Sequence, residues 1–315
     1  MQAELCTLLG IQHPIIMAPM FLVTTTEMMI AANRAGITGC IPAHNFRSDA
    51  EFRKSLQTIR ENAPGPIGVN VVSNRSNLYY KSQLKACLDL RVDYIITSLG
   101  SPEEIIRECR PLGIKVICDV INEEYAMRVA AMKPDALIAV NNLAGGHFGP
   151  LPPETLIPLL KQKTGLPIIS AGGVGNHQQM EYMLSLGACG VSIGSPFIAT
   201  TEASVSDAYK QAIVDYGEKD IVMTTKISGT PCAVINTPYL QKIGTQQNWL
   251  EALLNKNKRL KKWAKMLTFY KGMRSLEKAA FSATYQTIWC AGKSIESVHS
   301  VRSIEEVVRE LIKSV

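Results

Sequence analysis

The sequence predicts an α/β protein with the TIM-barrel fold, a (β/α)₈ barrel. Eight short apolar runs recur along the first two hundred residues, which is typical of parallel strands buried on both faces. Segments with apolar residues at helical spacing lie between most of these runs. An open doubly wound sheet is the main alternative, but it usually carries a G-x-G-x-x-G fingerprint after its first strand. Here the first strand ends in Ala18-Pro19-Met20, which favours the barrel.

Eight strands are predicted, each followed by a helix or by a gap long enough for one. The strands are His13–Ala18, Thr38–Pro42, Ile67–Val71, Tyr94–Thr97, Lys115–Cys118, Ala136–Val140, Pro167–Ser170 and Gly190–Ile193. The helices are Glu51–Arg60, Lys81–Leu90, Glu103–Arg110, Glu123–Met132, Glu154–Lys163 and Gln178–Leu186. Asn122 and Asn176 stand where a side chain can accept a hydrogen bond from the first turn of a helix, so both are predicted N-caps.

The alternation stops after about residue 200. We therefore predict a barrel core over 1–200, which a C-terminal amphipathic helix within 300–315 closes. Residues 201–299 are predicted to form a mainly helical insertion, or lid, beside or over the barrel mouth. This region includes a basic helix from about Lys256 to Ala283.

Charge and cysteine content narrow the class of protein. The 315 residues carry a net charge of +6, concentrated near Lys256–Lys265, and no nucleic-acid-binding motif accompanies it. A solvated helix face explains this charge, and attraction of an anionic substrate or carrier is the alternative. None of the eight cysteines forms a C-x-x-C pair, which indicates buried thiols in a reducing, cytoplasmic setting without a metal site. No apolar stretch is long enough for a membrane span, and no secretory signal is evident.

Two glycine-containing loops predict a phosphate site. Gly172 and Gly173 follow the seventh strand, and Gly194 and Ser195 follow the eighth. Loops seven and eight form the common phosphate site of TIM barrels, where free backbone N–H groups face the anion. The alternative to a phosphate site is that both loops are ordinary tight turns.

Other strand ends carry candidates for the reaction itself. Glycines flank His147 in the sixth loop, and histidine titrates near neutral pH, so we predict that it is a general base or a hydrogen-bond donor. Asn70 ends the third strand and offers both a donor and an acceptor, which suits a flavin or base edge. Met20 could pack against a flat ring. The pair His44-Asn45 also points to the mouth, whereas His13, His177 and His299 are predicted to be non-catalytic.

Taken together, these motifs resemble the nitronate monooxygenase family, also called 2-nitropropane dioxygenase, which includes flavin-dependent enoyl-acyl-carrier-protein reductases. The motifs are Ala18-Pro19-Met20, Gly68-Val69-Asn70, Ala144-Gly145-Gly146-His147, Ala171-Gly172-Gly173-Val174 and Ile193-Gly194-Ser195. The resemblance implies FMN at the barrel mouth, with its phosphate on Gly172, Gly173, Gly194 and Ser195. Its ring would lie near Ala18, Pro19, Met20 and Asn70, with Gly145 and Gly146 alongside.

The resemblance also implies a reaction. His147 matches the family's active-site histidine, which deprotonates a nitroalkane or hydrogen-bonds a nitronate. The substrate is then a small molecule, O₂ is the second reactant, and the products are a carbonyl compound and nitrite. Two alternatives stay open: an NAD(P)H-dependent FMN reductase acting on an enoyl thioester or a quinone, and a barrel protein that binds a phosphate ligand without redox chemistry. The oligomeric state is not predicted.

Overall fold

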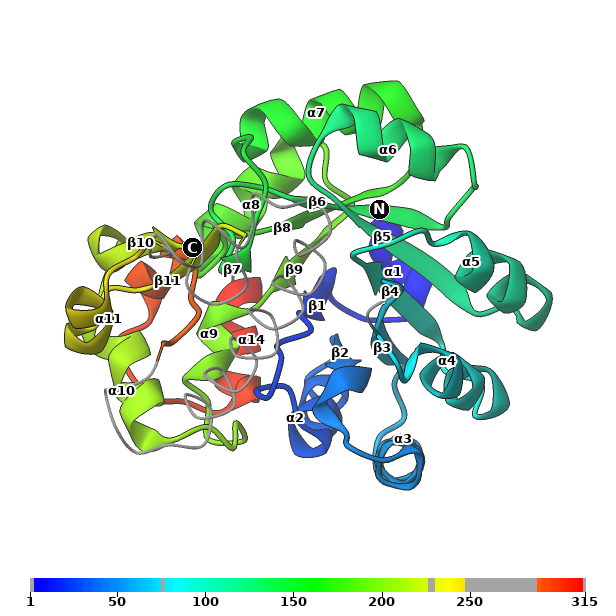
Figure 1. Ribbon diagram of the computed structural model, residues 1–315, viewed down its shortest axis with the longest axis horizontal. Coiled ribbons are helices and arrows are strands. Elements are labelled where there is room, and N and C mark those ends of the chain that lie inside the picture. Colours follow the sequence, from blue (N-terminus) through cyan, green and yellow to red (C-terminus); the bar gives the residue numbers. More distant parts are fainter. Residues whose placement is uncertain (1–2, 75–76, 226–229, 247–287, 314–315) are drawn as a thin grey trace, which may run out of the picture.

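The computed structural model describes residues 3–74, 77–225, 230–246 and 288–313. Its centre is a closed barrel of parallel strands in the order β1-β2-β3-β4-β5-β6-β8-β9, surrounded by helices (Figure 1). The predicted TIM barrel is confirmed. The barrel closes where β1 pairs with β9, with Ile15 opposite Val191 and Met17 opposite Ile193. The strands are β1 Ile15–Met17, β2 Thr38–Pro42, β3 Ile67–Val72, β4 Tyr94–Ser98, β5 Lys115–Val120, β6 Ala136–Val140, β8 Ile168–Ala171 and β9 Gly190–Ile193.

Burial on both faces explains why the apolar runs became strands. Every residue of β2 and β9 is buried, as is nearly every residue of the other barrel strands. Each strand therefore shields one face inside the barrel and the other beneath the helices, so neither face needs polar residues. The predicted bounds agree with the observed strands to within about two residues, which is the usual margin.

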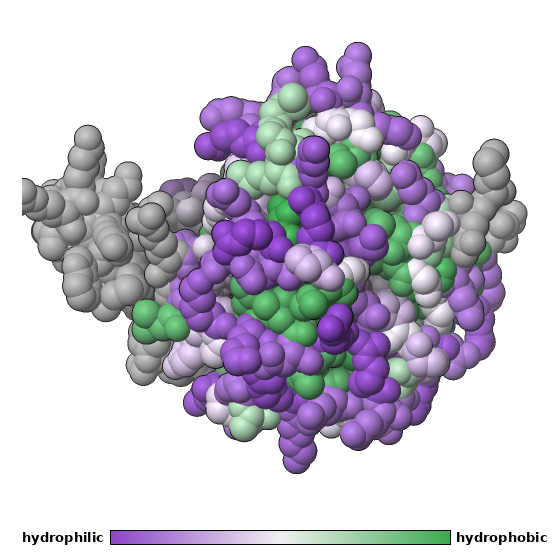
Figure 2. Space-filling view, turned by 90° about the vertical axis from the view of Figure 1, so that its right-hand side faces the viewer, coloured by the Kyte–Doolittle hydropathy of each residue, from purple (hydrophilic) through white to green (hydrophobic). Residues whose placement is uncertain are grey.

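Amphipathic helices form the outer layer. They are α1 Glu4–Leu9, α2 Thr26–Arg34, α3 Asp49–Asn62, α4 Tyr80–Asp89, α5 Glu103–Cys109, α6 Glu123–Ala130, α7 Pro153–Thr164 and α8 His177–Ser185. The side chains of Asn122 and Asn176 accept hydrogen bonds from Tyr125 N and Gln179 N, so both predicted caps are confirmed. Figure 2 shows the mostly hydrophilic outer surface of one side, interrupted by a hydrophobic area near its centre. Within the described ranges, no helix is both long and apolar enough to cross a bilayer.

Helix α14, Ile304–Ile312, packs against α2 and α8 beside the barrel. Its N-terminus has a capping box: Ser303 Oγ accepts from Glu306 N at 3.2 Å, and the Glu306 carboxylate accepts from Ser303 N at 2.8 Å. We expect Ser303→Ala to lower the free energy of unfolding by about 1 kcal/mol, because a helix N–H loses its partner. Chemical denaturation measures this. Glu305→Gln, in the same turn, is the control and should change little; equal losses in both variants would contradict the capping role.

A small antiparallel sheet lies beside the barrel mouth, and its strand order is β10-β11-β7. It joins β7 Gly146–His147, β10 Ile221–Thr224 and β11 Cys232–Ile235, next to α10 Asp207–Asp215 and α11 Pro238–Ile243 (Figure 1). The sequence did not indicate this sheet. The predicted basic helix over 256–283 lies outside the described residues, so the mainly helical insertion stays a prediction.

Candidate functional site

A cavity of about 1670 Å³ opens at the carboxyl ends of the barrel strands. It exceeds the roughly 300–1,000 Å³ of an ordinary small-molecule pocket, so a cofactor and a substrate can share it. The structure brings the predicted site residues to its wall, apart from the pair His44-Asn45. These residues are Ala18, Pro19, Met20, Asn70, Gly145, Gly146, His147, Gly172, Gly173, Gly194 and Ser195.

The two predicted phosphate loops follow neighbouring strands. Strands β8 and β9 pair directly, with Ala171 opposite Ser192, so Gly172 and Gly194 leave the barrel side by side. Gly172 has φ +108°, and a Cβ atom there would lie 2.5 Å from the backbone N of Ala144. Only glycine allows this close approach, so the loop after β8 rests on the loop after β6.

A returning segment of chain completes this part of the wall. The buried Ser195 Oγ accepts a hydrogen bond from Gly292 N at 2.9 Å, which leaves the hydroxyl proton available to a ligand. A Cβ atom on Gly145 would lie 2.6 Å from Gly292 N, so the two backbones are in direct contact. Residues more than a hundred positions apart in the sequence therefore form one surface.

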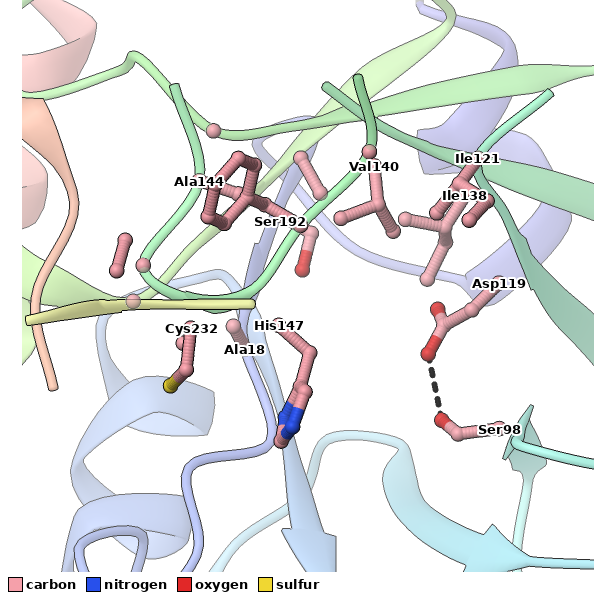
Figure 3. A pocket seen from close by; sticks show the side chains of 18 of the residues that line it. Ala18, Ser98, Asp119, Ile121, Ile138, Val140, Ala144, His147, Ser192 and Cys232 are labelled. Carbon is pink, nitrogen blue, oxygen red and sulfur yellow. Dashed lines mark hydrogen bonds between the residues drawn. The ribbon is translucent and has the colours of Figure 1, made fainter. Parts of the chain in front are cut away.

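His147 projects into the cavity from the small sheet (Figure 3). Its strand β7 pairs with β11, and the register places His147 opposite Cys232. The side chain is accessible from the cavity, but the surrounding protein still lowers the pKa of His147 by desolvation. The imidazole is therefore neutral at neutral pH, which is the form that can accept a proton.

A row of polar side chains crosses the ends of β3, β4 and β5. Asn70 was predicted as a site residue, but Ser98 and Asp119 were missed. Asn70 Nδ2 donates to Ser98 Oγ at 2.9 Å, and Ser98 Oγ donates to the Asp119 carboxylate at 2.5 Å (Figure 3). Burial raises the pKa of Asp119 to about 6, although the hydrogen bond from Ser98 opposes this shift. The sequence could have indicated Ser98 and Asp119, because each directly follows the predicted end of an apolar strand.

The candidate pair His44-Asn45 does not contribute to the cavity wall, and Asn45 has structural contacts instead. Asn45 accepts from Leu22 N and donates to Thr24 O, both at 2.8 Å, so it braces the loop after β1. Neither Asn45 nor its neighbour His44 lines the cavity. His177 lies at the start of α8, where its Nδ1 is 2.8 Å from Leu311 O.

The charges around the cavity are unevenly placed. Among the described residues of its wall, Asp119 is the only carboxylate, and Arg128 and Lys293 are the cations. Among the described residues that line the cavity, no acidic side chain lies on the loops after β6, β8 and β9, so the N–H groups of these loops suit an anion. The described part of the chain holds no cluster of side chains that could bind a metal ion.

Comparisons with known proteins agree on one family. The family model described as nitronate monooxygenase matches residues 72–314. A nitronate monooxygenase from Paraburkholderia phytofirmans is 27% identical over 271 residues, covering 71% of this chain and 74% of the relative. A second relative, from Mycobacterium tuberculosis, is 28% identical over 246 residues, covering 77% of this chain and 68% of the relative. It is a (3aS,4S,5R,7aS)-5-hydroxy-7a-methyl-1-oxo-octahydro-1H-indene-4-carboxyl-CoA dehydrogenase.

Solved structures share the architecture. FabK from Thermotoga maritima superimposes with a TM-score of 0.86 at 25% identity, covering 99% of this chain and 95% of that one. A nitroalkane oxidase from Streptomyces ansochromogenes has the same fold, with a TM-score of 0.79 at 20% identity. The match covers 98% of this chain and 96% of that one.

Proposed function

The chain belongs to the nitronate monooxygenase family, a family of oxidoreductases, and we propose that it is an FMN-dependent nitronate monooxygenase. It would oxidise alkyl nitronates with O₂ to carbonyl compounds and nitrite. The observation that carries this proposal is the position of His147, neutral and accessible, in the same cavity as the paired glycine loops.

The volume of the cavity and the charges of its wall support FMN binding. Gly172, Gly173, Gly194 and Ser195 would hold the phosphate, since a hydroxyl and backbone N–H groups meet there without a carboxylate. A Cβ atom on Gly194 would lie 3.5 Å from the Met20 sulfur, an ordinary van der Waals contact, so the protein leaves room beside Gly194. Ala18, Pro19, Met20 and Asn70 would border the flavin ring, and Gly145 and Gly146 would lie alongside it.

The protein's own part in the reaction is binding and proton transfer. The neutral His147 ring nitrogen accepts the proton from the carbon that bears the nitro group, and the electron pair of that C–H bond moves onto the nitro group. The imidazolium then donates a hydrogen bond to the anionic nitronate. Bound FMN would supply the electron acceptor for this anion and the reactivity toward O₂.

Oxygen consumption tests the proposal directly. The purified protein should be yellow, and it should consume O₂ with propyl-2-nitronate or 3-nitropropionate in the absence of NAD(P)H. Nitrite should appear together with the carbonyl product. A yellow protein that turns over no nitronate or nitroalkane would remove this function while leaving FMN in place.

A reductase or dehydrogenase acting on a thioester is the second candidate. Its support is the similarity to the carboxyl-CoA dehydrogenase and to FabK, together with a cavity that continues along α6 past Tyr125, Arg128 and Met132. Anaerobic mixing with NADH or NADPH separates the two candidates. Rapid bleaching of the flavin absorbance supports the reductase, and an unchanged spectrum supports the monooxygenase.

A further inference from the structure

Two cysteine thiols, those of Cys232 and Cys290, meet in the wall of the cavity. Their Sγ atoms are 3.7 Å apart, although 58 positions separate the two residues in the chain. Both residues line the cavity, so a small molecule that enters it can reach them. The proton transfer proposed for His147 uses neither thiol.

Pairing of the small sheet holds the two cysteines at this separation. Cys232 lies on β11, opposite Thr224 of β10 and His147 of β7. Cys290 forms an antiparallel bridge to Val234, two positions further along β11. Residues two apart on a strand share one face of a sheet, so Cys232 and Cys290 are diagonal neighbours on the same face.

Trp289 anchors the segment that carries Cys290. Its buried ring stacks on Tyr209, with the ring centroids 5.4 Å apart and the ring planes at 10°. Trp289 O accepts a hydrogen bond from Ile235 N at 2.9 Å, and Cys290 O accepts one from the Tyr209 hydroxyl at 2.6 Å. The two sulfur atoms therefore face each other on fixed backbones, and side-chain rotation is what would close the distance to the roughly 2.0 Å of a disulfide.

The two thiols differ in their access to solvent. All eight cysteines lie in the described part of the chain, and Cys290 is the one among them that is not buried. Cys232 is 1% exposed, and its hydrogen bond with Cys290 and its burial both raise the pKa of Cys232. An oxidant in the cavity therefore reaches Cys290 first. A buried partner next to an accessible cysteine is the arrangement that resolves an oxidised thiol into a disulfide.

A base lies opposite the buried thiol. The register of β7 and β11 places His147 directly across from Cys232, where Cβ atoms are about 4.5–5.5 Å apart. Figure 3 shows the two side chains extending in the same direction from their strands. Desolvation lowers the pKa of His147, so the neutral imidazole can accept the Cys232 proton and activate this sulfur as a nucleophile.

We propose that Cys232 and Cys290 form a reversible disulfide when a hydroperoxide enters the cavity. The Cys290 sulfur attacks the peroxide O–O bond and becomes a sulfenic acid, while the other oxygen leaves as water or an alcohol. The Cys232 sulfur then attacks the Cys290 sulfur, and the displaced hydroxide leaves as water with the proton that Cys232 gave up. A thiol reductant restores both thiols by exchange. This inference goes beyond the proposed function, since neither flavin nor nitronate takes part.

The disulfide would fasten the returning segment of the chain to β11. Gly292, two positions after Cys290, contacts Gly145 and donates a hydrogen bond to Ser195. These contacts form one side of the proposed phosphate site. A covalent link at Cys290 makes this side harder to open, so oxidation of the pair should slow the release of FMN.

Peptide mapping of the unchanged protein tests the inference directly. After treatment with hydrogen peroxide, digestion without reductant should yield one cross-linked pair of peptides that contains Cys232 and Cys290. Dithiothreitol should remove the cross-link and restore both thiols. The proposal is overturned if both residues still react with iodoacetamide after peroxide treatment and denaturation, or if Cys290 is found as a sulfinic acid beside an unmodified Cys232.

The melting temperature and three variants give further readouts. Oxidation should raise the melting temperature of the unchanged protein by about 2–8 °C, because the link restricts the unfolded chain. Cys290→Ser should lose both the cross-link and this rise, and Cys232→Ser should accumulate a sulfenic acid at Cys290 that dimedone traps. Cys189→Ala removes a buried cysteine outside the cavity and should behave like the unchanged protein.

FMN release is measured by the return of flavin fluorescence after dilution. It should be slower from the oxidised than from the reduced protein, and equal for the two treatments in Cys290→Ser. Equal rates in the unchanged protein, or a melting temperature that oxidation leaves unchanged, would contradict the fastening of the segment. The cross-link is read out in protein without flavin as well, so its absence and a failure of the monooxygenase proposal are separate results.

Discussion

Replacing His147 with alanine should lower kcat/KM for a neutral nitroalkane by about 10²–10⁴-fold, the range typical of a lost general base. The variant should keep its flavin absorbance, because His147 lies on the small sheet and outside the glycine loops that would hold the phosphate. With a preformed nitronate the loss should be smaller, since no carbon proton has to be removed. Stopped-flow flavin reduction under anaerobic conditions measures both rates.

The pH dependence of the same reaction gives a second check. Desolvation lowers the pKa of His147, so nitroalkane turnover should rise with pH through a value below that of an ordinary histidine. His147→Gln keeps a hydrogen-bond donor but cannot take the proton, so it should lose nitroalkane turnover like the alanine variant and retain more of the nitronate reaction. If His147→Ala turns over nitroalkanes at a near-unchanged rate, His147 has only a packing role.

Replacing Gly172 with alanine should remove most of the FMN that we propose the cavity binds. The residue has φ +108°, and the added methyl group would meet Ala144 N and Asn141 Oδ1 at 2.5 Å. Asn141 also ties the two loops together, because its Nδ2 donates to Gly172 O at 3.1 Å. The loop after β8 would have to move away from the loop after β6, which opens the proposed phosphate site. Flavin content per chain is the measurement.

Gly113 provides a matched control for this variant. It also has a positive φ, +73°, but a Cβ atom there would meet nothing within 4 Å. Gly113→Ala should therefore cost only the backbone strain, about 1–2 kcal/mol of unfolding free energy, and keep its flavin. Gly172→Ala should lose a further ~1–3 kcal/mol because of overpacking. Full flavin content in Gly172→Ala would contradict the proposed phosphate site.

The barrel could be predicted because its signals are local. Each strand is a mostly apolar run of three to six residues, as in β1 and β6, and each needs only its own sequence to be recognised. The loops after β8 and β9 were predictable for the same reason, since glycine marks them. The position of a loop at a strand end then follows from the fold.

The missed parts of the site depend on contacts between distant residues. Strand β7 has two residues and exists because Gly146 and His147 pair with Ala233 and Cys232. Asp119 fell just beyond the predicted end of its strand, since a carboxylate argues against a buried position. Pairing with Ile138 on β6 nevertheless continues β5 through Asp119 to Val120, and this carries the carboxyl to the cavity.

The contact between Gly145 and Gly292 has a consequence for synthesis of the protein on the ribosome. A nascent chain that has reached residue 200 already contains all eight barrel strands, yet the segment that packs on Gly145 and bonds Ser195 has not been made. Such a chain has the barrel but lacks one side of its mouth. We therefore expect ribosome-bound intermediates of this length to bind flavin poorly. Flavin should bind only late in translation.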